Sequence, residues 1–191
     1  MQMTPIYLAS TSPRRRELLE QIGVAYQAIG AAVDETPRDG EAPEVYVLRM
    51  ALEKARAGRA RAPDKTRAVL GADTAVVIGG AVLGKPRDRA DGIAMLRRLS
   101  GVTHHVYTGA ALVDGEREAS RLSVSAVSFR IIDERECAAY WDGGEPADKA
   151  GGYAIQGRGA VFVSRLEGSY SGVMGLPLFE TAELLHEFGL V

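Results

Sequence analysis

Cysteine is almost absent from this chain of 191 residues, where Cys137 is the single example. One cysteine excludes an intrachain disulfide framework and a thiolate metal site within the chain. Histidine is also scarce, and none of the three, His104, His105 and His186, has a partner at zinc-binding spacing. Because His104 and His105 are neighbours on an expected strand, their side chains point to opposite faces. We therefore interpret all three histidines as structural.

Strong net charge and long apolar runs are missing as well. The net charge is −2, so no basic field points to nucleic acid or a membrane surface as a partner. No apolar segment approaches the ~20 residues of a membrane span, and the N-terminus has no charged leader followed by an apolar run. The hydrophobic content of 46% is enough for a substantial core. We expect a soluble intracellular protein with one large domain or two tightly joined lobes.

Strands and helices interleave along the chain, with no internal repeat and no clear linker. Apolar periodicity and capping signals predict strands at 6–9, 25–29, 71–78, 81–86, 105–113 and 117–129, and helices near 13–22, 43–58, 88–99, 134–141 and 177–188. Interleaved helices and antiparallel hairpins predict an α/β fold in which a mixed, mostly antiparallel twisted sheet is flanked by helices.

The predicted hairpin at 71–86 carries the first candidate functional residues. Gly79-Gly80 is a two-residue turn signal between two apolar strands. The open end of the hairpin carries Asp73 and Lys85 among glycines and a proline, where a buried hairpin would carry Val or Ile. An acid and a cation at this position suggest a functional site.

The register of this hairpin poses a difficulty. Counting outward from the turn pairs Ile78 with Ala81, and therefore Thr74 with Lys85, which turns Asp73 to the opposite face. If Asp73 and Lys85 serve one phosphate site, the ladder must end or bulge near Gly71 or Gly84.

A second candidate site lies where the first strand meets the first helix. Ser12 fits the helix N-cap and Pro13 its first position. Arg14, Arg15 and Arg16 then place cations at a helix N-terminus, against the macrodipole. A solvated arginine cluster is one interpretation; a phosphate-binding cradle of backbone N–H groups, hydroxyls and arginines is the one we favour.

Three further features are ambiguous on their own. Lys54 borders the apolar stripe of its helix and either snorkels outward or reaches into a cleft, and position alone favours snorkelling. The adjacent acids Asp34 and Glu35 end an apolar segment, where acids are mostly solvated. In the glycine-rich tract 143–160, strand-forming residues favour close backbone approach to a ligand over a disordered linker.

Seven short motifs, in order, resemble the Maf-type nucleoside triphosphate pyrophosphatases, a family first described as septum-formation inhibitors. They run from residue 6 to residue 180: Ser10-Thr11-Ser12-Pro13-Arg14-Arg15, Glu53-Lys54-Ala55, Gly71-Ala72-Asp73-Thr74, Gly84-Lys85-Pro86, Asp148-Lys149-Ala150-Gly151, Ile155-Gln156-Gly157 and Gly175-Leu176-Pro177-Leu178. A P-loop NTPase is excluded, because Gly84-Lys85 is followed by proline rather than Ser or Thr.

The resemblance implies a single Maf-type domain over residues 1–191, elongated and related in fold to inosine triphosphate pyrophosphatases, with two lobes around a central nucleotide cleft. It also implies a cytoplasmic homodimer that cleaves a nucleoside triphosphate to the monophosphate and pyrophosphate with a divalent cation, Mg²⁺ or Mn²⁺. Neither nucleic acid nor a membrane is expected as a partner.

Within the family the chain is most similar to the branch that acts on dTTP and UTP. That branch's specificity positions correspond to Arg14, Thr74 and Gln156, and its catalytic acid corresponds to Asp73. A physical argument supports Gln156, since thymine and uracil present a donor beside an acceptor that a glutamine amide can match.

A mechanism follows as a hypothesis. Asp73 acts on the attacking water as general base or helps to hold the metal, with Glu35 as the metal partner by family position. The expected triphosphate-binding residues are Ser10, Ser12, Arg14, Arg15, Lys54 and Lys85. Two alternatives stay open: a pyrophosphatase for 7-methyl-GTP or for many nucleotides, and a nucleotide-binding regulator of cell division.

Overall fold

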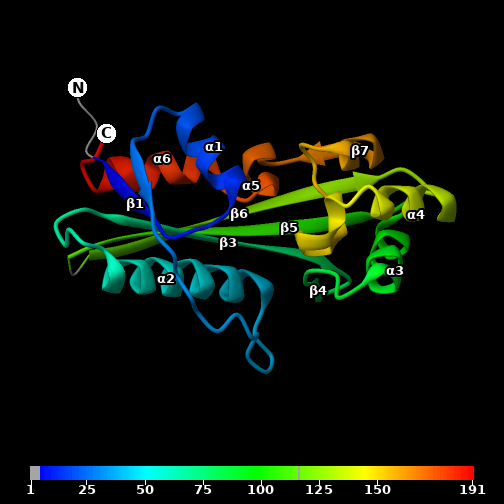
Figure 1. The fold of residues 1–191 in the computed structure, drawn as a ribbon, viewed down its shortest axis with the longest axis horizontal. Helices are drawn as coiled ribbons and strands as arrows, with labels where there is room; N and C mark the ends of the chain where they lie inside the picture. Colours follow the sequence, from blue (N-terminus) through cyan, green and yellow to red (C-terminus); the bar gives the residue numbers. More distant parts are fainter. Residues whose placement is uncertain (1–4, 116) are drawn as a thin grey trace. The chain divides into compact units, whose positions relative to one another are not determined.

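The structure is a computed structural model that describes residues 5–115 and 117–191. The helices are α1 (Pro13–Gln21), α2 (Pro43–Arg61), α3 (Arg89–Leu99), α4 (Glu134–Asp142), α5 (Tyr170–Met174) and α6 (Leu178–Glu187) (Figure 1). The strands are β1 (Ile6–Leu8), β2 (Tyr26–Ala28), β3 (Val69–Ile78), β4 (Ala81–Leu83), β5 (Thr103–Asp114), β6 (Arg117–Phe129) and β7 (Val163–Glu167). Short 3₁₀ turns follow α4: η1 (Glu145–Asp148), η2 (Ala150–Gly152) and η3 (Arg158–Phe162).

The strands form a seven-stranded sheet in the order β2-β1-β3-β5-β6-β7, with β4 paired to β3. Strand β1 pairs in parallel with β2 and with β3, whereas β4 is antiparallel to β3 and β7 is antiparallel to β6. The predicted mixed α/β fold, a sheet flanked by helices, is therefore confirmed. None of the helices in the described part of the chain has the length and apolar character needed to cross a membrane.

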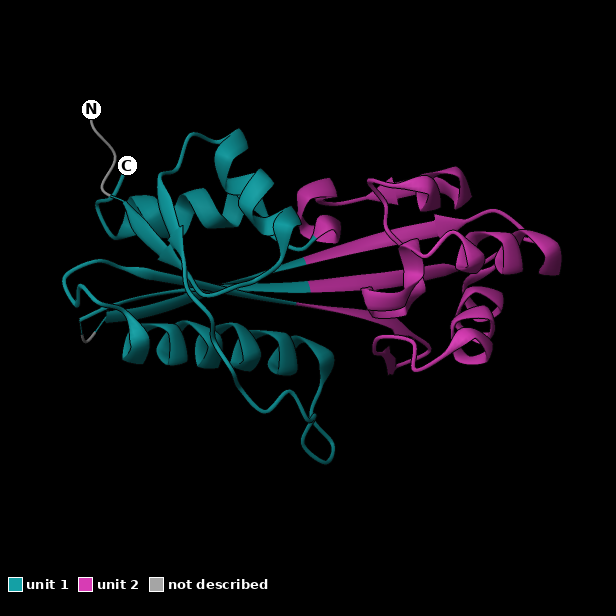
Figure 2. Ribbon diagram, in the orientation of Figure 1, with its two compact units in different colours: residues 1–73, 108–123, 175–191 teal, residues 74–107, 124–174 magenta. Residues whose placement is uncertain are grey.

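The chain divides into two compact units (Figure 2). Unit 1 comprises residues 1–73, 108–123 and 175–191, and unit 2 comprises residues 74–107 and 124–174. Strands β3, β5 and β6 contribute residues to both units. Asp73 is the last residue of the first stretch of unit 1, and Thr74 is the first residue of unit 2.

Within unit 1, α2 lies on one side of the strands and α1 and α6 lie on the other (Figure 1). Two glycines let α2 touch the sheet backbone. A Cβ added at Gly71 would lie 2.2 Å from the carbonyl oxygen of Ala51, and one at Gly109 would lie 2.5 Å from that of Val47. Because any side chain at these positions would push the helix away, glycine is what sets α2 directly on β3 and β5.

Unit 2 has an aromatic core. His104 packs edge-on against Phe129 and Tyr153, with ring centroids 4.9 and 5.4 Å apart, and Tyr140 packs edge-on against Phe162 at 5.1 Å. The Nε2 atom of His104 and the hydroxyl of Tyr153 are 2.8 Å apart. Edge-to-face pairs of this kind contribute roughly 0.5–1.5 kcal/mol each beyond the apolar area they bury.

The central hairpin has the predicted turn and register. Gly79 and Gly80 both have positive φ, +55° and +78°, as a two-residue turn of this hand requires. Ile78 pairs with Ala81 as predicted, but the ladder ends where Val76 pairs with Leu83. Strand β4 therefore stops before Gly84, one of the two places where the ladder was expected to end.

Local capping signals predicted the helix starts well. The carboxylate of Asp88 caps α3 by accepting from the N–H of Asp91, and Asp133 and Glu136 form the predicted capping box of α4. Ser12 occupies the N-cap of α1, although its side chain makes no capping hydrogen bond. Helix α2 runs to Arg61, three residues beyond the predicted end.

The glycine-rich tract folds into short turns: residues 145–162 contain η1, η2 and η3. Close backbone approach occurs within the protein, since a Cβ at Gly151 would lie 2.9 Å from a methyl group of Val76 and one at Gly159 would lie 2.7 Å from the hydroxyl of Tyr140. The expected approach to a ligand stays a prediction. The positive φ of Gly151, +69°, lies in the left-handed region that favours glycine. Helix α5 was not predicted.

Candidate active site

A buried ion pair joins α2 to β3 in unit 1. The Nζ atom of Lys54 lies 2.6 Å from Oδ1 of Asp73 and 2.6 Å from Oε1 of Glu35. Lys54 is 8% exposed and Asp73 is 7% exposed, whereas the side chain of Glu35 is 52% exposed. We call these three residues the Lys54 cluster. The snorkelling interpretation of Lys54 is therefore wrong, because the side chain reaches inward to an acid.

The local sequence explains why Lys54 meets Asp73. Ala51, Lys54 and Ala55 share one helix face at spacings of three and four residues. Ala51 and Ala55 contact Gly71, and Asp73 is two residues further along the same face of β3. The helix that touches the strand at Gly71 thus carries Lys54 to the acid, and burying the pair costs less than burying either charge alone.

Arg15 lies in the electrostatic field of the same cluster. Its Nε donates to the carbonyl oxygen of Gly175 at 2.7 Å, and its Nη1 donates to Oγ of Ser10 at 3.3 Å. Burial lowers the pKa of Arg15; the charge of Asp73 opposes this effect, Arg14 adds to it and Glu35 opposes it. Arg15 thus supplies a cation near the two acids, held in place by a backbone carbonyl and a hydroxyl.

The structure therefore brings five predicted site residues together in unit 1: Ser10, Arg15, Glu35, Lys54 and Asp73. Two other predicted residues, Ser12 and Arg14, lie at the start of α1 and are half-buried. The backbone N–H of Ser12 donates to Oγ of Ser10 at 3.1 Å.

The remaining predicted residues belong to unit 2. Thr74 is half-buried in β3, Lys85 is exposed just beyond the end of β4, and Gln156 is exposed between η2 and η3. Their expected roles in binding the triphosphate and the base stay predictions.

Sequence reasoning missed Tyr46, whose hydroxyl donates to the carbonyl oxygen of Glu35 at 2.9 Å. Burial, together with the negative charges of Asp73 and Glu35, raises the pKa of Tyr46 to about 12. The hydroxyl therefore stays protonated and able to donate at neutral pH. Nothing in the local pattern predicts this contact, because Tyr46 and Glu35 lie eleven residues apart.

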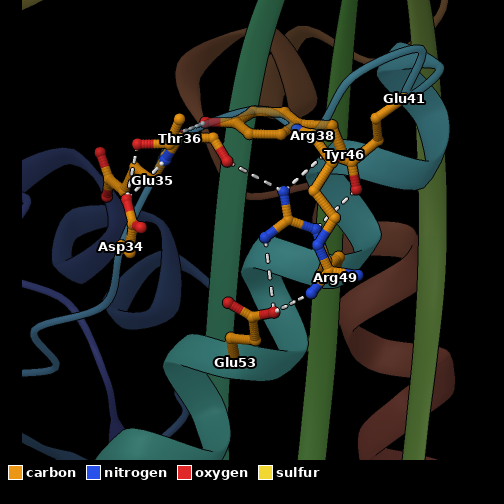
Figure 3. Close-up of polar contacts among 8 residues, drawn as sticks. All are labelled: Asp34, Glu35, Thr36, Arg38, Glu41, Tyr46, Arg49 and Glu53. Carbon is orange, nitrogen blue, oxygen red and sulfur yellow. Dashed lines mark hydrogen bonds and ion pairs between the residues drawn. The ribbon is translucent and has the colours of Figure 1, made fainter.

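Sequence reasoning also missed Arg49, which binds the segment that carries Glu35 (Figure 3). Its guanidinium makes two 2.6 Å hydrogen bonds to the carboxylate of Glu41 and one of 3.4 Å to Oε1 of Glu53. The one sequence signal was the spacing of four residues between Arg49 and Glu53 on a predicted helix. The pairing with Glu41 depends on how the preceding loop folds.

The donor set of the Lys54 cluster suits a hard divalent cation. The carboxylate oxygens of Glu35 and Asp73 each contact one nitrogen at 2.6 Å, so they lie close to each other. Mg²⁺ is commonly held by one or two carboxylates together with water and substrate phosphates. Within residues 5–115 and 117–191 no group of three or more His, Cys, Asp or Glu residues has a metal-binding arrangement. In this site the protein groups that could bind a divalent cation are therefore the carboxylates of Glu35 and Asp73.

Comparison with known proteins places the chain in a family. Residues 5–188 match the family described as "Maf-like protein". The chain is 63% identical over 187 residues to the dTTP/UTP pyrophosphatase of Alkalilimnicola ehrlichii, covering 96% of this chain and 92% of the relative. It is 53% identical over 196 residues to the protein of the same name from Aromatoleum aromaticum, covering 96% and 95%.

Among solved structures, the Staphylococcus aureus Ham1 protein aligns with 68% of this chain and 73% of its own, at 16% identity and a TM-score of 0.46. This structural similarity is weak. The family match, in contrast, spans nearly the whole chain, and its relatives share more than half of their residues with it. The chain therefore belongs to the Maf family.

Proposed function

We propose that this protein hydrolyses dTTP and UTP, modified pyrimidine nucleotides among them, to the monophosphate and pyrophosphate. Two relatives that share 63% and 53% of their residues with the chain carry the name dTTP/UTP pyrophosphatase. The observation that carries the proposal is the burial of Asp73 against Lys54 with Glu35 alongside. Buried charges are costly, and a carboxylate and a cation held together in this way are typical of a catalytic site.

Asp73 is the catalytic carboxylate of this proposal. Water adds to the phosphorus of the substrate, the phosphoanhydride bond breaks and pyrophosphate leaves. Asp73 takes the proton of the attacking water, or would help to hold a divalent cation; both roles need an ionised carboxylate near the reacting phosphorus. Lys54 keeps that carboxylate oriented at 2.6 Å in the nucleotide-free protein.

Glu35 and Asp73 are the residues that would hold a divalent cation, Mg²⁺ or Mn²⁺. When bound, the cation offsets the negative charge of the phosphates. The ammonium of Lys54 lies between the two carboxylates and offsets their mutual repulsion. Of the two carboxylates, Glu35 is the one that can exchange Lys54 for a cation at low cost, because 52% of its side chain is exposed.

Four cations are assigned to binding of the triphosphate. Arg14, Arg15, Lys54 and Lys85 stabilise the charge that develops on the pyrophosphate leaving group, and Ser10 and Ser12 supply hydroxyl or backbone N–H donors. Arg15 is already oriented by Gly175 and Ser10, so little freedom is lost when it binds an anion.

Base recognition is assigned to Arg14, Thr74 and Gln156. The exposed amide of Gln156 offers an acceptor and a donor that match N3–H and O4 of thymine or uracil. A base with a different edge would leave polar groups unpaired, which discriminates strongly. As the family resemblance implies, we also propose a homodimer located in the cytoplasm.

Pyrophosphate release from a panel of canonical and modified nucleotides, with Mg²⁺, Mn²⁺ or EDTA, tests this function. We expect dTTP and UTP to be cleaved fastest with either metal and no turnover in EDTA. Faster cleavage of 7-methyl-GTP would contradict the base preference, and binding without turnover of any nucleotide would contradict the enzyme.

A further inference from the structure

The segment 34–41, between β2 and α2, has no regular secondary structure, yet it carries Glu35. The segment contacts α2 through a bidentate pair between Arg49 and Glu41 (Figure 3). Nε and Nη2 of Arg49 each lie 2.6 Å from a different carboxylate oxygen of Glu41. The side chain of Arg49 is 13% exposed and that of Glu41 is 5% exposed, so water screens this bidentate pair little.

Two consecutive backbone carbonyls of the segment are also held from α2. Nη2 of Arg49 donates to the carbonyl oxygen of Thr36 at 3.3 Å, and the hydroxyl of Tyr46 donates to that of Glu35 at 2.9 Å. The guanidinium of Arg49 lies over the ring of Tyr46, 5.6 Å from its centroid. Arg49 and Tyr46 therefore act together on one short stretch of backbone.

Fixing this backbone determines where the side chain of Glu35 can reach. Lys54 lies five residues after Arg49 on the same helix, and its ammonium meets Oε1 of Glu35 at 2.6 Å. Because the segment has no strand ladder of its own, its position depends on these side-chain contacts. Within the segment, Thr36 donates to Asp34 and the Arg38 N–H donates to Glu41. The guanidinium of Arg38 also pairs with Glu53 of α2 at 3.5 Å, with 70% of the Arg38 side chain exposed.

We propose that Arg49 is a positioning residue: by binding Glu41 and the Thr36 carbonyl, it places Glu35 beside Lys54 and Asp73. The inference rests on the proposed function only in giving Glu35 the role of metal ligand. The competing interpretation is an ion pair that stabilises the fold and does nothing for Glu35. The two differ in whether the effect of removing Arg49 requires Glu35 to be present.

The experiment measures Mn²⁺ binding to the full-length, nucleotide-free protein by isothermal titration calorimetry. Arg49→Gln should weaken Mn²⁺ binding about 10- to 100-fold, the usual loss when a group that orients a metal ligand is removed. In a Glu35→Gln background the same substitution should change the affinity less than twofold, because Arg49 acts through Glu35. Arg49→Lys, which keeps the charge but not the bidentate geometry, should fall between wild type and Arg49→Gln.

Arg56→Gln is the matched control. Arg56 lies on the same helix and in the same unit, and its guanidinium pairs with Glu118, away from the segment. We expect wild-type Mn²⁺ affinity in this variant. Tyr46→Phe, which removes only one hydroxyl, is the milder variant should Arg49→Gln fold poorly, and we expect it to weaken Mn²⁺ binding about three- to tenfold.

The proposal is overturned if Arg49→Gln and Tyr46→Phe both bind Mn²⁺ as wild type does. It is equally overturned if the effects of Arg49→Gln and Glu35→Gln multiply. The Mn²⁺ affinities do not depend on turnover. Failure to hydrolyse dTTP or UTP would therefore contradict the proposed function, whereas only the Mn²⁺ affinities decide whether Arg49 positions Glu35.

Discussion

The two units bury their titratable groups in opposite ways. Unit 1 buries an ionised pair, Lys54 and Asp73, with a second carboxylate at the same ammonium. The titratable groups buried in unit 2 have pKa values shifted in the direction that favours the neutral form. Burial lowers the pKa of His104 to about 4 and raises those of Cys137, Tyr140 and Tyr153.

We interpret the charged pair of unit 1 as part of the proposed reaction and the neutral buried groups of unit 2 as part of the folded core. A neutral buried ring contributes packing and costs little in desolvation, whereas a buried charge must be compensated by a partner. A protein gains little stability from such a pair, which agrees with the role in catalysis proposed above for Asp73. Variants in each unit test this difference.

The largest effect is expected for Asp73→Asn in unit 1. The amide keeps the size of the side chain but can neither accept a proton from water nor bind a metal as a carboxylate does. Turnover of dTTP should fall about 10²- to 10⁴-fold, measured as pyrophosphate release, while urea unfolding shows a folded protein. Near-normal turnover would remove Asp73 from the mechanism.

Next in size is the loss of stability in Lys54→Met. Removing the ammonium leaves the buried carboxylate of Asp73 without its 2.6 Å partner, and breaking a buried pair typically costs about 3–5 kcal/mol of unfolding free energy. The double variant Lys54→Met/Asp73→Leu, which removes both charges, should recover most of that loss. A double variant less stable than Lys54→Met would show that the pair itself stabilises unit 1.

A pH effect comes third and concerns unit 2. Burial, and to a lesser degree the charge of His105, holds the pKa of His104 at about 4, below the ordinary value of 6.5. Between these values the unfolded chain binds a proton that the folded protein does not, so unfolding free energy falls as pH falls from 6.5 to about 4. The contribution of this group is roughly 3 kcal/mol at most.

Urea unfolding of wild type and His104→Phe at several pH values tests this effect. The variant should lose the His104 share of the pH dependence, whereas His105→Gln, on the opposite and exposed face of β5, should retain it. Identical slopes in wild type and His104→Phe would contradict a neutral buried His104.

The smallest effect is expected on the outer face of α2. Arg56 and Glu118 form an ion pair whose side chains are 54% and 31% exposed. Arg56→Gln should change unfolding free energy by less than about 1 kcal/mol. A loss as large as that of Lys54→Met would mean that burial does not decide what an ion pair on this helix contributes.

The sequence predicted those features that depend on neighbours in the chain. The Gly79-Gly80 turn, the Asp88 cap and the Asp133–Glu136 capping box all act over two to four residues, and the structure has each of them. The same holds for the pairing of Ile78 with Ala81 next to the turn.

Features that depend on distant contacts were predicted poorly. The sequence alone favours a snorkelling Lys54, because its contact with Asp73 depends on where β3 lies. For Arg49 the sequence shows only Glu53 as a partner, because the pairing with Glu41 depends on how segment 34–41 lies against α2. In the tract 143–160, Gly151 and Gly159 pack against Val76 and Tyr140. The local sequence gives no sign of these distant partners.

The most direct test of the different roles of the two units measures dTTP turnover and urea unfolding on the same preparations of Asp73→Asn and His104→Phe. The account predicts that Asp73→Asn loses turnover about 10²- to 10⁴-fold and stays stably folded. It predicts that His104→Phe keeps turnover near wild type and loses about 1–3 kcal/mol of unfolding free energy, because the hydroxyl of Tyr153 loses its partner. The reverse pattern, with turnover lost at His104 and retained at Asp73, would contradict the account.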